Sequence, residues 1–293
     1  MESILDRKGI ILSGGLGSRL YPLTVSMSKQ LMPIYDKPMI YYPLSTLMLA
    51  NIREFLIIIK EEDYDNFFKL LGDGKKWGIS IKYKFQKNPD GLAQAMILAE
   101  DFLSGHPSAL ILGDNLFHGS EVPVVLKEAN SFLNGATIFS YPVRDPERYG
   151  VINFDKMGNP ISIEEKPKKS KSNYAITGLY FYDSLAPTYA KSLKPSERGE
   201  LEITSLNKIY LQNNSLRIKT FSRGTAWLDT GTIETLHEAS SYIRTLENRQ
   251  GLKAGCPEEI SWRNGWINNE QLLELSYEHS KSGYGDYLKM LLT

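Results

Sequence analysis

The chain has 293 residues, and its 34 lysines and arginines balance its 34 aspartates and glutamates, so the formal net charge is zero. A protein that binds nucleic acid through its charge normally carries a strong basic excess, so this balance argues against that class. With 42% hydrophobic and 23% charged residues, the composition is that of a globular protein of one or two domains.

Cysteine and histidine usage excludes further classes of protein. The single cysteine, Cys256, cannot form an internal disulfide, and the four scattered histidines have no metal-ligand spacing. The first residues lack the pattern of a signal peptide, and no apolar run approaches the roughly 20 residues of a membrane span. We therefore expect a cytoplasmic protein.

Apolar periodicity in the first half predicts strands that alternate with helices. The predicted strands are residues 9–12, 55–59, 79–85, 109–112 and 136–143. The predicted helices are residues 39–50, 67–71, 93–103 and 122–133. Such a series is typical of an α/β fold with a mostly parallel sheet and helices on both faces.

The pattern changes in the second half of the chain. Strand-like segments joined by turn residues predict an antiparallel insertion laid over the main sheet, and they are residues 151–154, 161–165 and 174–182. Helices are predicted for residues 233–246, 271–275 and 284–292. We expect one compact unit with a helical C-terminal region.

A glycine-rich turn follows the first predicted strand and contains Gly14, Gly15 and Gly17. Such a turn lets backbone N–H groups approach phosphate oxygens. It is not a P-loop, and Leu20 stands where a dinucleotide fingerprint would have its third glycine.

Two cationic residues follow this turn, Arg19 and Lys29. Arg can donate two parallel hydrogen bonds to a phosphate and Lys acts as a point charge, so both suit the distal oxygens of a triphosphate. From the residues alone, solvated surface charges are the simpler interpretation.

Two aspartates are candidates for a metal site. Asp114 follows a buried strand, at the carboxyl edge where open α/β sheets place their ligands, and Asp229 could be brought beside it. Two such carboxylates can hold Mg²⁺ against phosphate oxygens. A turn-forming role for Asp114 and a helix cap for Asp229 are the structural alternatives.

These motifs, taken together and in this order, closely resemble the glucose-1-phosphate thymidylyltransferases of the sugar nucleotidyltransferase family. The matching segments are residues 14–24, 29–44, 91–95, 112–115, 164–167, 199–204 and 227–231. The family loop usually has Ser where this chain has Leu16, so only backbone donors remain there. Ile176 replaces a common Val.

The resemblance implies a Rossmann-like fold of the nucleotide-diphospho-sugar transferase type. The implied reaction joins dTTP and α-D-glucose 1-phosphate to give dTDP-glucose and pyrophosphate, the first step towards dTDP-L-rhamnose. It also implies catalytic roles for Arg19, Lys29, Lys166, Asp114 and Asp229, with the two aspartates binding Mg²⁺.

The remaining binding residues also come from the resemblance. Those implied for the nucleotide are Leu12, Gly14, Gly15, Gly17, Arg19, Lys29, Gln30, Gln86, Gly91 and Asp114. Those implied for the sugar phosphate are Asn115, Tyr149, Gly150, Glu165, Lys166, Ile176 and Tyr180. A Gln amide both donates and accepts, so Gln86 can pair with the imide edge of thymine or uracil.

The same resemblance predicts the domains and the assembly. We expect a catalytic domain at residues 1–240, with a nucleotide-binding part at about 1–115 and a sugar-binding part at about 116–230, and a helical region at residues 241–293. A homotetramer inhibited by dTDP-L-rhamnose is implied. The alternatives are a uridylyltransferase, a non-catalytic nucleotide-binding regulatory subunit and, least in keeping with the loop, a dinucleotide-dependent oxidoreductase.

Overall fold

The computed structural model describes residues 6–293. Its strands are β1 (Lys8–Leu12), β2 (Pro33–Ile34), β3 (Lys37–Pro38), β4 (Glu54–Ile59), β5 (Ser80–Phe85), β6 (Ser108–Leu112), β7 (Asn115–His118), β8 (Ala136–Pro142), β9 (Gly150–Phe154), β10 (Pro160–Glu165), β11 (Tyr174–Tyr182), β12 (Leu216–Thr220) and β13 (Ala226–Asp229). Its α-helices are α1 (Tyr41–Leu49), α2 (Tyr64–Leu71), α3 (Gln94–Leu98), α4 (Glu100–Leu103), α5 (Val122–Ser131), α6 (Ala186–Ser192), α7 (Ile203–Gln212), α8 (Ile233–Gln250), α9 (Pro257–Arg263), α10 (Asn269–Glu278) and α11 (Gly283–Met290).

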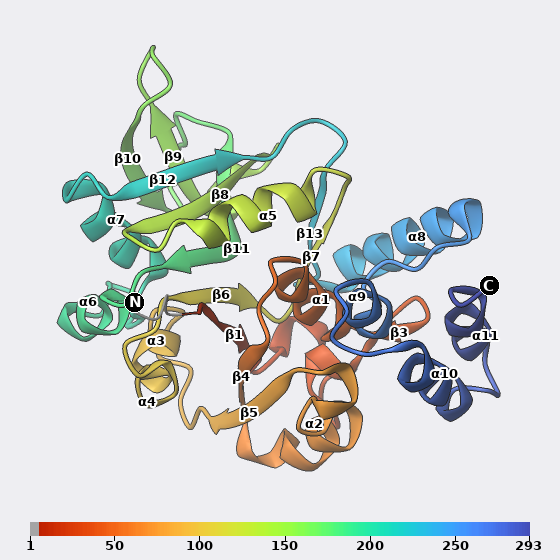
Figure 1. Cartoon of the computed structure of the whole chain (residues 1–293). Coiled ribbons are helices and arrows are strands. Elements are labelled where there is room, and N and C mark those ends of the chain that lie inside the picture. The colour runs from red at the N-terminus through yellow and green to blue at the C-terminus, as the bar shows by residue number, and fades with distance from the viewer. Residues whose placement is uncertain (1–5) are drawn as a thin grey trace.

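A nine-stranded sheet runs through the molecule (Figure 1). Strands β6, β1, β4 and β5 are neighbours in that order and pair in parallel. Beyond β6, strand β11 runs antiparallel and leads to β9 and β10, while β8 and β12 branch from it. The prediction of an α/β fold with a parallel sheet and helices is confirmed.

Both faces of β1, β4 and β6 are buried, and their residues are apolar without alternation. In β1, Ile11 faces one hydrophobic core and Ile10 faces the other. The first core also contains residues of α1, α2 and α5, and the second contains residues of α3, α6 and α7. Continuous apolar runs are typical of strands covered on both faces, which is why these strands could be predicted.

Most predicted elements are present with boundaries shifted by a few residues. The predicted helix 93–103 is two helices, α3 and α4, which meet at Ala99, where ψ is −5°. Backbone hydrogen bonds from Ala99 to Ala95 and from Leu103 to Ala99 continue across the junction. The helical pattern was therefore correct, and the change of direction is local.

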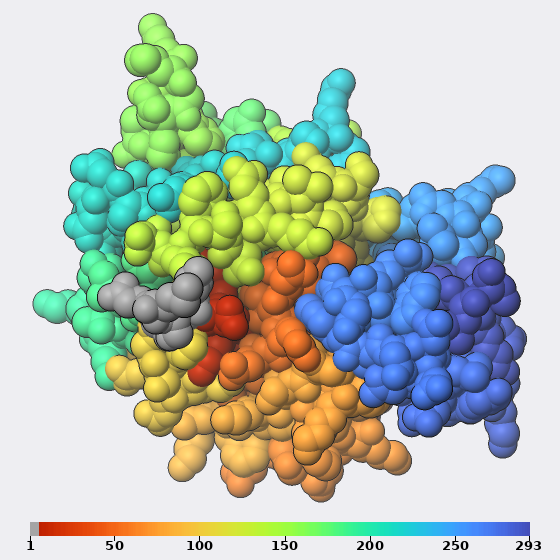
Figure 2. All heavy atoms as spheres, viewed as in Figure 1, coloured from red at the N-terminus to blue at the C-terminus, as the bar shows by residue number. Residues whose placement is uncertain are grey.

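The antiparallel segments extend the main sheet rather than lie over it. Strand β11 pairs with β6 and, further along, with β9 on one side, with Leu179 opposite Ile111, and with β8 on the other side. Strand β8 pairs in parallel with β12, which was not predicted. Pairing partners far apart in the sequence decide this arrangement, and periodicity does not report them. The β9–β10 hairpin projects from the surface (Figure 2).

The C-terminal helices pack on the same core as the sheet. Leu272 and Leu288 belong to the cluster that contains α1 residues, and α9 contacts α1. A third cluster joins α8 to the β2–β3 hairpin through Leu236, Ile243 and Ile34. No helix within the described part of the chain has both the length and the apolar character needed to cross a membrane.

A buried group of charges ties the β2–β3 hairpin to the end of α8. The Lys37 ammonium lies 2.5 Å from Asp36 Oδ1 and 2.7 Å from Glu247 Oε1, and Lys253 contacts both acids. The side chains of Lys37 and Glu247 are only 2% and 5% exposed. Removing the central cation would leave the buried Glu247 carboxylate without full compensation.

We therefore expect Lys37→Met to lower the free energy of unfolding by about 3 kcal/mol or more. The control is Lys75→Met, because Lys75 pairs with Asp73 at 2.7 Å but is 87% exposed. That change should cost less than about 1 kcal/mol. Urea unfolding of both variants measures the difference. Equal, small losses would show that the buried pairs stabilise no more than an exposed one.

Candidate active site

A cleft of about 1480 Å³ opens at the carboxyl ends of β1 and β6. The glycine-rich turn after β1 forms one wall, and the ends of β10 and β13 with the first turn of α8 form others. Ligands of open α/β sheets bind at this edge, beyond the carboxyl ends of the parallel strands. The cleft is therefore the candidate active site.

The cleft brings together all but four of the site residues predicted from the sequence. Those that line it are Gly15, Gly17, Arg19, Lys29, Gln30, Asp114, Asn115, Tyr149, Gly150, Glu165, Lys166, Ile176, Tyr180 and Asp229. Those that do not are Leu12, Gly14, Gln86 and Gly91. Residues as far apart in the sequence as Gly15 and Asp229 thus meet around one cavity.

The residues predicted to read the base lie just behind the cleft wall. Gln86 is 5% exposed, lies against Gly14, and donates to Gln94 Oε1 at 2.6 Å. Gly91 has φ 113°, and a Cβ there would come within 2.5 Å of the Leu201 backbone. The absence of a side chain at Gly91 therefore allows the backbone of Leu201 to pack closely against it.

Two short strands that the sequence did not reveal bring the carboxylates together. Strand β7 pairs antiparallel with β13, so that Asn115 lies opposite Asp229. The Thr230 backbone N–H and hydroxyl both donate to the Asp114 carbonyl, at 3.1 and 2.8 Å. This pairing fixes Asp114 and Asp229 on neighbouring backbones at the floor of the cleft.

Asp114 is held as a carboxylate. The Lys29 ammonium, itself buried, lies 2.5 Å from Asp114 Oδ2, and the Asn115 amide donates to Oδ1 at 3.0 Å. Burial opposes ionisation of Asp114, but the Lys29 charge and these hydrogen bonds hold its pKa below the usual value. Lys29 is therefore an ion-pair partner of Asp114 as well as a cation at the cleft.

The pKa of Asp229 is shifted in the opposite direction, upwards. Burial and the charge of Asp114 raise the pKa of Asp229 to about 6, although Lys29, Arg148 and Arg19 oppose the shift. A raised pKa in one of two adjacent carboxylates is the usual result of bringing like charges together. The pair binds one proton more readily than an isolated aspartate does.

The two carboxylates suit a divalent cation. Among residues 6–293, no side chain lies within hydrogen-bonding or ion-pair distance of the Asp229 carboxylate, although Asp229 is half-buried. A hard cation such as Mg²⁺ is bound in proteins by one or two carboxylates plus phosphate oxygens, and would offset the repulsion between Asp114 and Asp229. No cluster of three or more His, Cys, Asp or Glu residues occurs in the described part of the chain, so substrate oxygens would have to complete the coordination.

The raised pKa of Asp229 gives a stability prediction for the metal-free protein. An unfolded aspartate has a pKa of about 3.9, so the folded state holds this proton more tightly and gains stability at low pH. That gain is lost as the pH rises through about 6. We therefore expect Asp229→Asn, melted in EDTA, to raise the unfolding temperature by a few degrees at pH 8 and hardly at pH 4. A lower melting temperature at pH 8 would contradict the electrostatic account.

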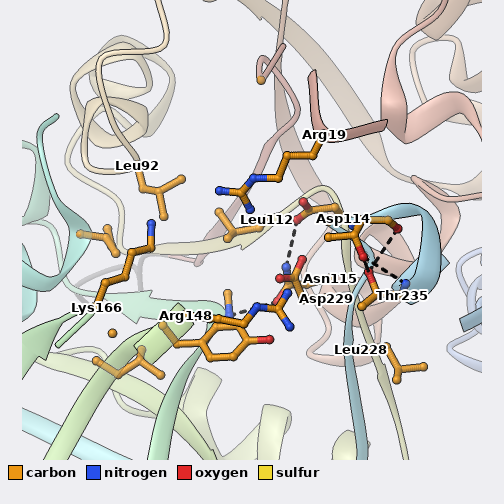
Figure 3. Close-up of a pocket in the computed structure, with 18 of the residues that line it drawn as sticks. Arg19, Leu92, Leu112, Asp114, Asn115, Arg148, Lys166, Leu228, Asp229 and Thr235 are labelled. Atoms are coloured by element: carbon orange, nitrogen blue, oxygen red, sulfur yellow. Dashed lines mark hydrogen bonds between the residues drawn. The ribbon is translucent and has the colours of Figure 1, made fainter. Parts of the chain in front are cut away.

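Basic side chains surround the carboxylates. Figure 3 shows Arg19, Arg148 and Lys166 extending into the cavity that contains Asp114 and Asp229. The Lys166 backbone is in the left-handed region at φ 41°, and its N–H donates to the Tyr149 carbonyl at 3.0 Å. Because several cationic side chains surround the two carboxylates, the cleft can bind a highly anionic molecule.

The sequence reasoning missed several residues that line this cleft. They are Arg144, Arg148, Gly178, Arg198, Thr204 and Trp227. Arg148 directly precedes Tyr149 and Trp227 is two residues before Asp229, so proximity to known motif positions was a usable signal for these two. Arg198 lies in a loop without periodicity, and its one sequence signal is that it directly precedes Gly199, the first residue of another matching segment.

Glu165 stands at the other end of the cleft from the glycine-rich turn. Burial and the nearby Glu202 raise its pKa, while Lys166 at 3.7 Å and Arg198 at 3.6 Å oppose that shift. A carboxylate with two cations beside it can accept hydrogen bonds from the hydroxyls of a polar ligand. Tyr149, packed at 5.1 Å from Trp227, forms the apolar floor beside it.

The fold, the glycine-rich turn and the carboxylate pair define a nucleotidyltransferase site, and the chain belongs to the nucleotidyl transferase family, whose model matches residues 8–245. The predicted membership of this family is thereby confirmed. The glucose-1-phosphate thymidylyltransferase of Neisseria meningitidis is 55% identical over 97% of this chain and 99% of its own length. The enzyme of the same name from Xanthomonas campestris is 56% identical over 98% and 97%.

Solved structures agree with this assignment. A putative glucose-1-phosphate thymidylyltransferase from Bacillus anthracis superposes with a TM-score of 0.75 at 43% identity, covering 81% of this chain and 95% of that one. A UDP-glucose pyrophosphorylase solved with UDP-glucose gives 0.70 at 25% identity, covering 83% and 100%. The resemblance to the thymidylyltransferases seen in the sequence is therefore confirmed over nearly the whole chain.

Proposed function

We propose that the protein joins dTTP to α-D-glucose 1-phosphate, giving dTDP-glucose and pyrophosphate, as the first step of dTDP-deoxysugar (dTDP-L-rhamnose) synthesis. The observation that carries the proposal is the cleft itself, in which the neighbouring carboxylates of Asp114 and Asp229 are ringed by cations at the edge of a parallel sheet. The thymidylyltransferases at 55% and 56% identity support this choice of base and sugar.

In the proposed reaction a phosphate oxygen of glucose 1-phosphate attacks the α-phosphorus of dTTP. The new P–O bond forms in line with the bond to the β-phosphate, and that bond breaks with its electron pair leaving on pyrophosphate. Positioning and charge neutralisation can carry such a transfer without a covalent enzyme intermediate. The site needs groups that hold two anions together.

Different residues of the cleft would act on the leaving and on the attacking phosphate groups. Arg19 and Lys29, with the backbone of Gly15 and Gly17, would hold the leaving pyrophosphate. Lys166 would offset the repulsion between the attacking phosphate and the triphosphate. One unit-charge pair at 4 Å is worth about 4 kcal/mol at an effective dielectric of 20, so each cation can matter greatly.

Asp114 and Asp229 would bind Mg²⁺ between them. The bound ion would supply positive charge and orientation to the phosphate oxygens. Lys29 and the Asn115 amide keep Asp114 ionised and oriented for this task. Neutralising Asp229 by protonation would weaken metal binding, so affinity for Mg²⁺ should fall below pH about 6.

The sugar and the base would occupy opposite ends of the cleft. Glu165 would accept hydrogen bonds from glucose hydroxyls, beside Asn115, Tyr149, Gly150, Ile176 and Tyr180. Gln86 and Gly91 would meet the base, with Leu12, Gly14 and Gln30 nearby. Because Gln86 lies behind the wall and donates to Gln94, the base would have to displace or join that hydrogen bond.

We expect dTTP to be preferred over UTP by about 10- to 200-fold in kcat/KM, because the two bases differ by one methyl group. Pyrophosphate release is measured across dTTP, UTP, ATP, CTP and GTP with glucose, galactose, mannose and glucosamine 1-phosphates. A uridylyltransferase would reverse the order of the first two nucleotides. Folded protein that binds nucleotide yet releases no pyrophosphate with any pair would instead be a regulatory subunit.

The assembly, location and domain limits stay predictions from the sequence. They are a homotetramer, inhibition by dTDP-L-rhamnose, a cytoplasmic location, and a catalytic domain ending near residue 240 before a helical region at residues 241–293. Light scattering tests whether the protein is a homotetramer. Titration with dTDP-L-rhamnose at subsaturating substrate tests the inhibition. If the inhibitor site lies between subunits, we expect inhibition to be lost in dilute, dissociated protein.

A further inference from the structure

The side chain of Asn115 connects three parts of the cleft. Its Oδ1 accepts hydrogen bonds from Trp227 Nε1 at 2.6 Å and from the Gly178 backbone N–H at 3.1 Å. Its Nδ2 donates to Asp114 Oδ1 at 3.0 Å. Strand β7 thus contributes an amide that lies between β11, β13 and the carboxylate pair.

The chemistry of the partners forces the orientation of this amide. An indole N–H and a backbone N–H can only donate, so the oxygen of Asn115 must face Trp227 and Gly178. An ionised carboxylate can only accept, so the NH₂ group must face Asp114. Reversing the amide would break all three contacts at once. A Cβ at Gly178 would lie 2.6 Å from Oδ1, which explains why glycine is needed there.

The Trp227 ring is held by two neighbouring tyrosines. It packs against Tyr149 at 5.1 Å and Tyr141 at 5.8 Å between ring centroids, and it is 8% exposed. Its N–H is already used by Asn115, so only the face or edge of the ring is available to a ligand. The same strand carries Asp229 two residues later, opposite Asn115.

In this arrangement each oxygen of the Asp114 carboxylate has its own partner. Lys29 binds Oδ2 and Asn115 binds Oδ1, so the plane of the carboxylate is set by two neighbours on different elements. Each carboxylate oxygen retains further lone pairs for a cation. Asn115 also retains one N–H on Nδ2, and since its oxygen is fully engaged it can only donate to a substrate.

We propose that Trp227 is a positioning residue for the metal-binding carboxylate: its indole N–H locks the Asn115 amide, which in turn orients Asp114. The inference rests on the proposed function, in which Asp114 and Asp229 bind the divalent cation. Asn115 would be one contact removed from the metal, and the loss of such a partner typically changes metal affinity or activity by 10- to 100-fold; Trp227 would act through Asn115.

The first test measures metal binding directly, by electron paramagnetic resonance of Mn²⁺ added to protein with dTTP. Trp227→Phe should raise the Mn²⁺ Kd by about 10-fold or more. The matched control is Trp262→Phe, because Trp262 Nε1 makes the same kind of bond to Asn269 Oδ1, at 2.8 Å, away from the cleft. An unchanged Kd in Trp227→Phe would overturn the proposal.

A second measurement separates the hydrogen bond from packing, since Phe is also smaller than Trp. Site-specific replacement of Trp227 by benzothienylalanine keeps the two-ring shape and removes only the N–H. Weakened Mn²⁺ binding in this protein supports the proposal, and wild-type binding contradicts it.

The proposed reaction and the positioning role can fail separately. If wild-type protein binds Mn²⁺ with dTTP, and Trp227→Phe weakens that binding, the positioning role is supported even if no dTDP-glucose forms. If the wild type makes dTDP-glucose and the Mn²⁺ Kd of the variant is unchanged, the reaction stands and the positioning role is wrong. Wild-type protein that binds no Mn²⁺ contradicts both.

Discussion

Asp229→Asn should lower turnover about a thousandfold or more at saturating dTTP, glucose 1-phosphate and Mg²⁺. The change removes one of two carboxylates that would bind the cation, and a catalytic metal supplies several kcal/mol of charge stabilisation. Each 1.36 kcal/mol is tenfold in rate, so a loss of about 4 kcal/mol is a thousandfold. Formation of dTDP-glucose, followed by chromatography, measures the effect.

The stability prediction makes this variant informative, because the same change should stabilise the metal-free fold at pH 8. Loss of activity could then not be attributed to unfolding. Asp155→Asn is the control, since Asp155 organises the exposed turn between β9 and β10 and does not line the cleft. Turnover of Asp229→Asn within tenfold of the wild type would contradict a metal-binding role.

Arg19→Ala and Lys166→Ala are each expected to lower kcat by about 100-fold or more. Their charges enter the cleft from the glycine-rich turn and from the end of β10, and would act on the leaving and attacking phosphates respectively. Removing one preorganised donor from a developing charge typically costs 10²- to 10³-fold in kcat. Steady-state rates at saturating substrates measure this directly.

The matched control for the lysine is Lys168→Ala, two residues further along the same segment. Lys168 is exposed and does not line the cleft, so its loss should change kcat less than twofold. The pyrophosphate KM in the reverse direction should rise for Arg19→Ala but not for Lys166→Ala. Near-normal kcat in both variants would remove these cations from the mechanism.

The fold could be predicted where a segment carries its own signal. Strands β1, β4 and β6 are buried on both faces, so their sequences are short apolar runs bounded by turn residues. Helix α8 begins with a capping box at Thr232 and ends at Gly251, both of which are local features. Such segments reveal their structure without knowledge of their partners.

Elements defined by distant partners could not be predicted. Strands β7 and β13 are four residues each and pair only with one another, across more than a hundred residues. Helix α6 has Pro187 in its first turn and only three buried residues, so its amphipathic pattern is too short to detect. The antiparallel strands were found, but their place in the main sheet depends on β11 pairing with β6.

The residues of the candidate site also divide into those with a local sequence signal and those that only folding brings to the cleft. Asp114 and the glycines were found because they follow a predicted strand, and Asp229 and Glu165 through their motifs. Arg198 reaches the cleft from a loop that contacts Glu200 and Glu202, and only the folded chain shows this. The contact of Trp227 with Asn115 likewise depends on strand pairing rather than on spacing in the sequence.

The most direct test of the account is a single-turnover measurement with excess protein, dTTP and glucose 1-phosphate, in which dTDP-glucose and pyrophosphate are both quantified. With Mg²⁺ we predict equal amounts of the two products, rising together, and neither product in EDTA. Pyrophosphate without dTDP-glucose, or no reaction from folded protein that binds dTTP, would contradict nucleotidyl transfer to the sugar phosphate in this cleft.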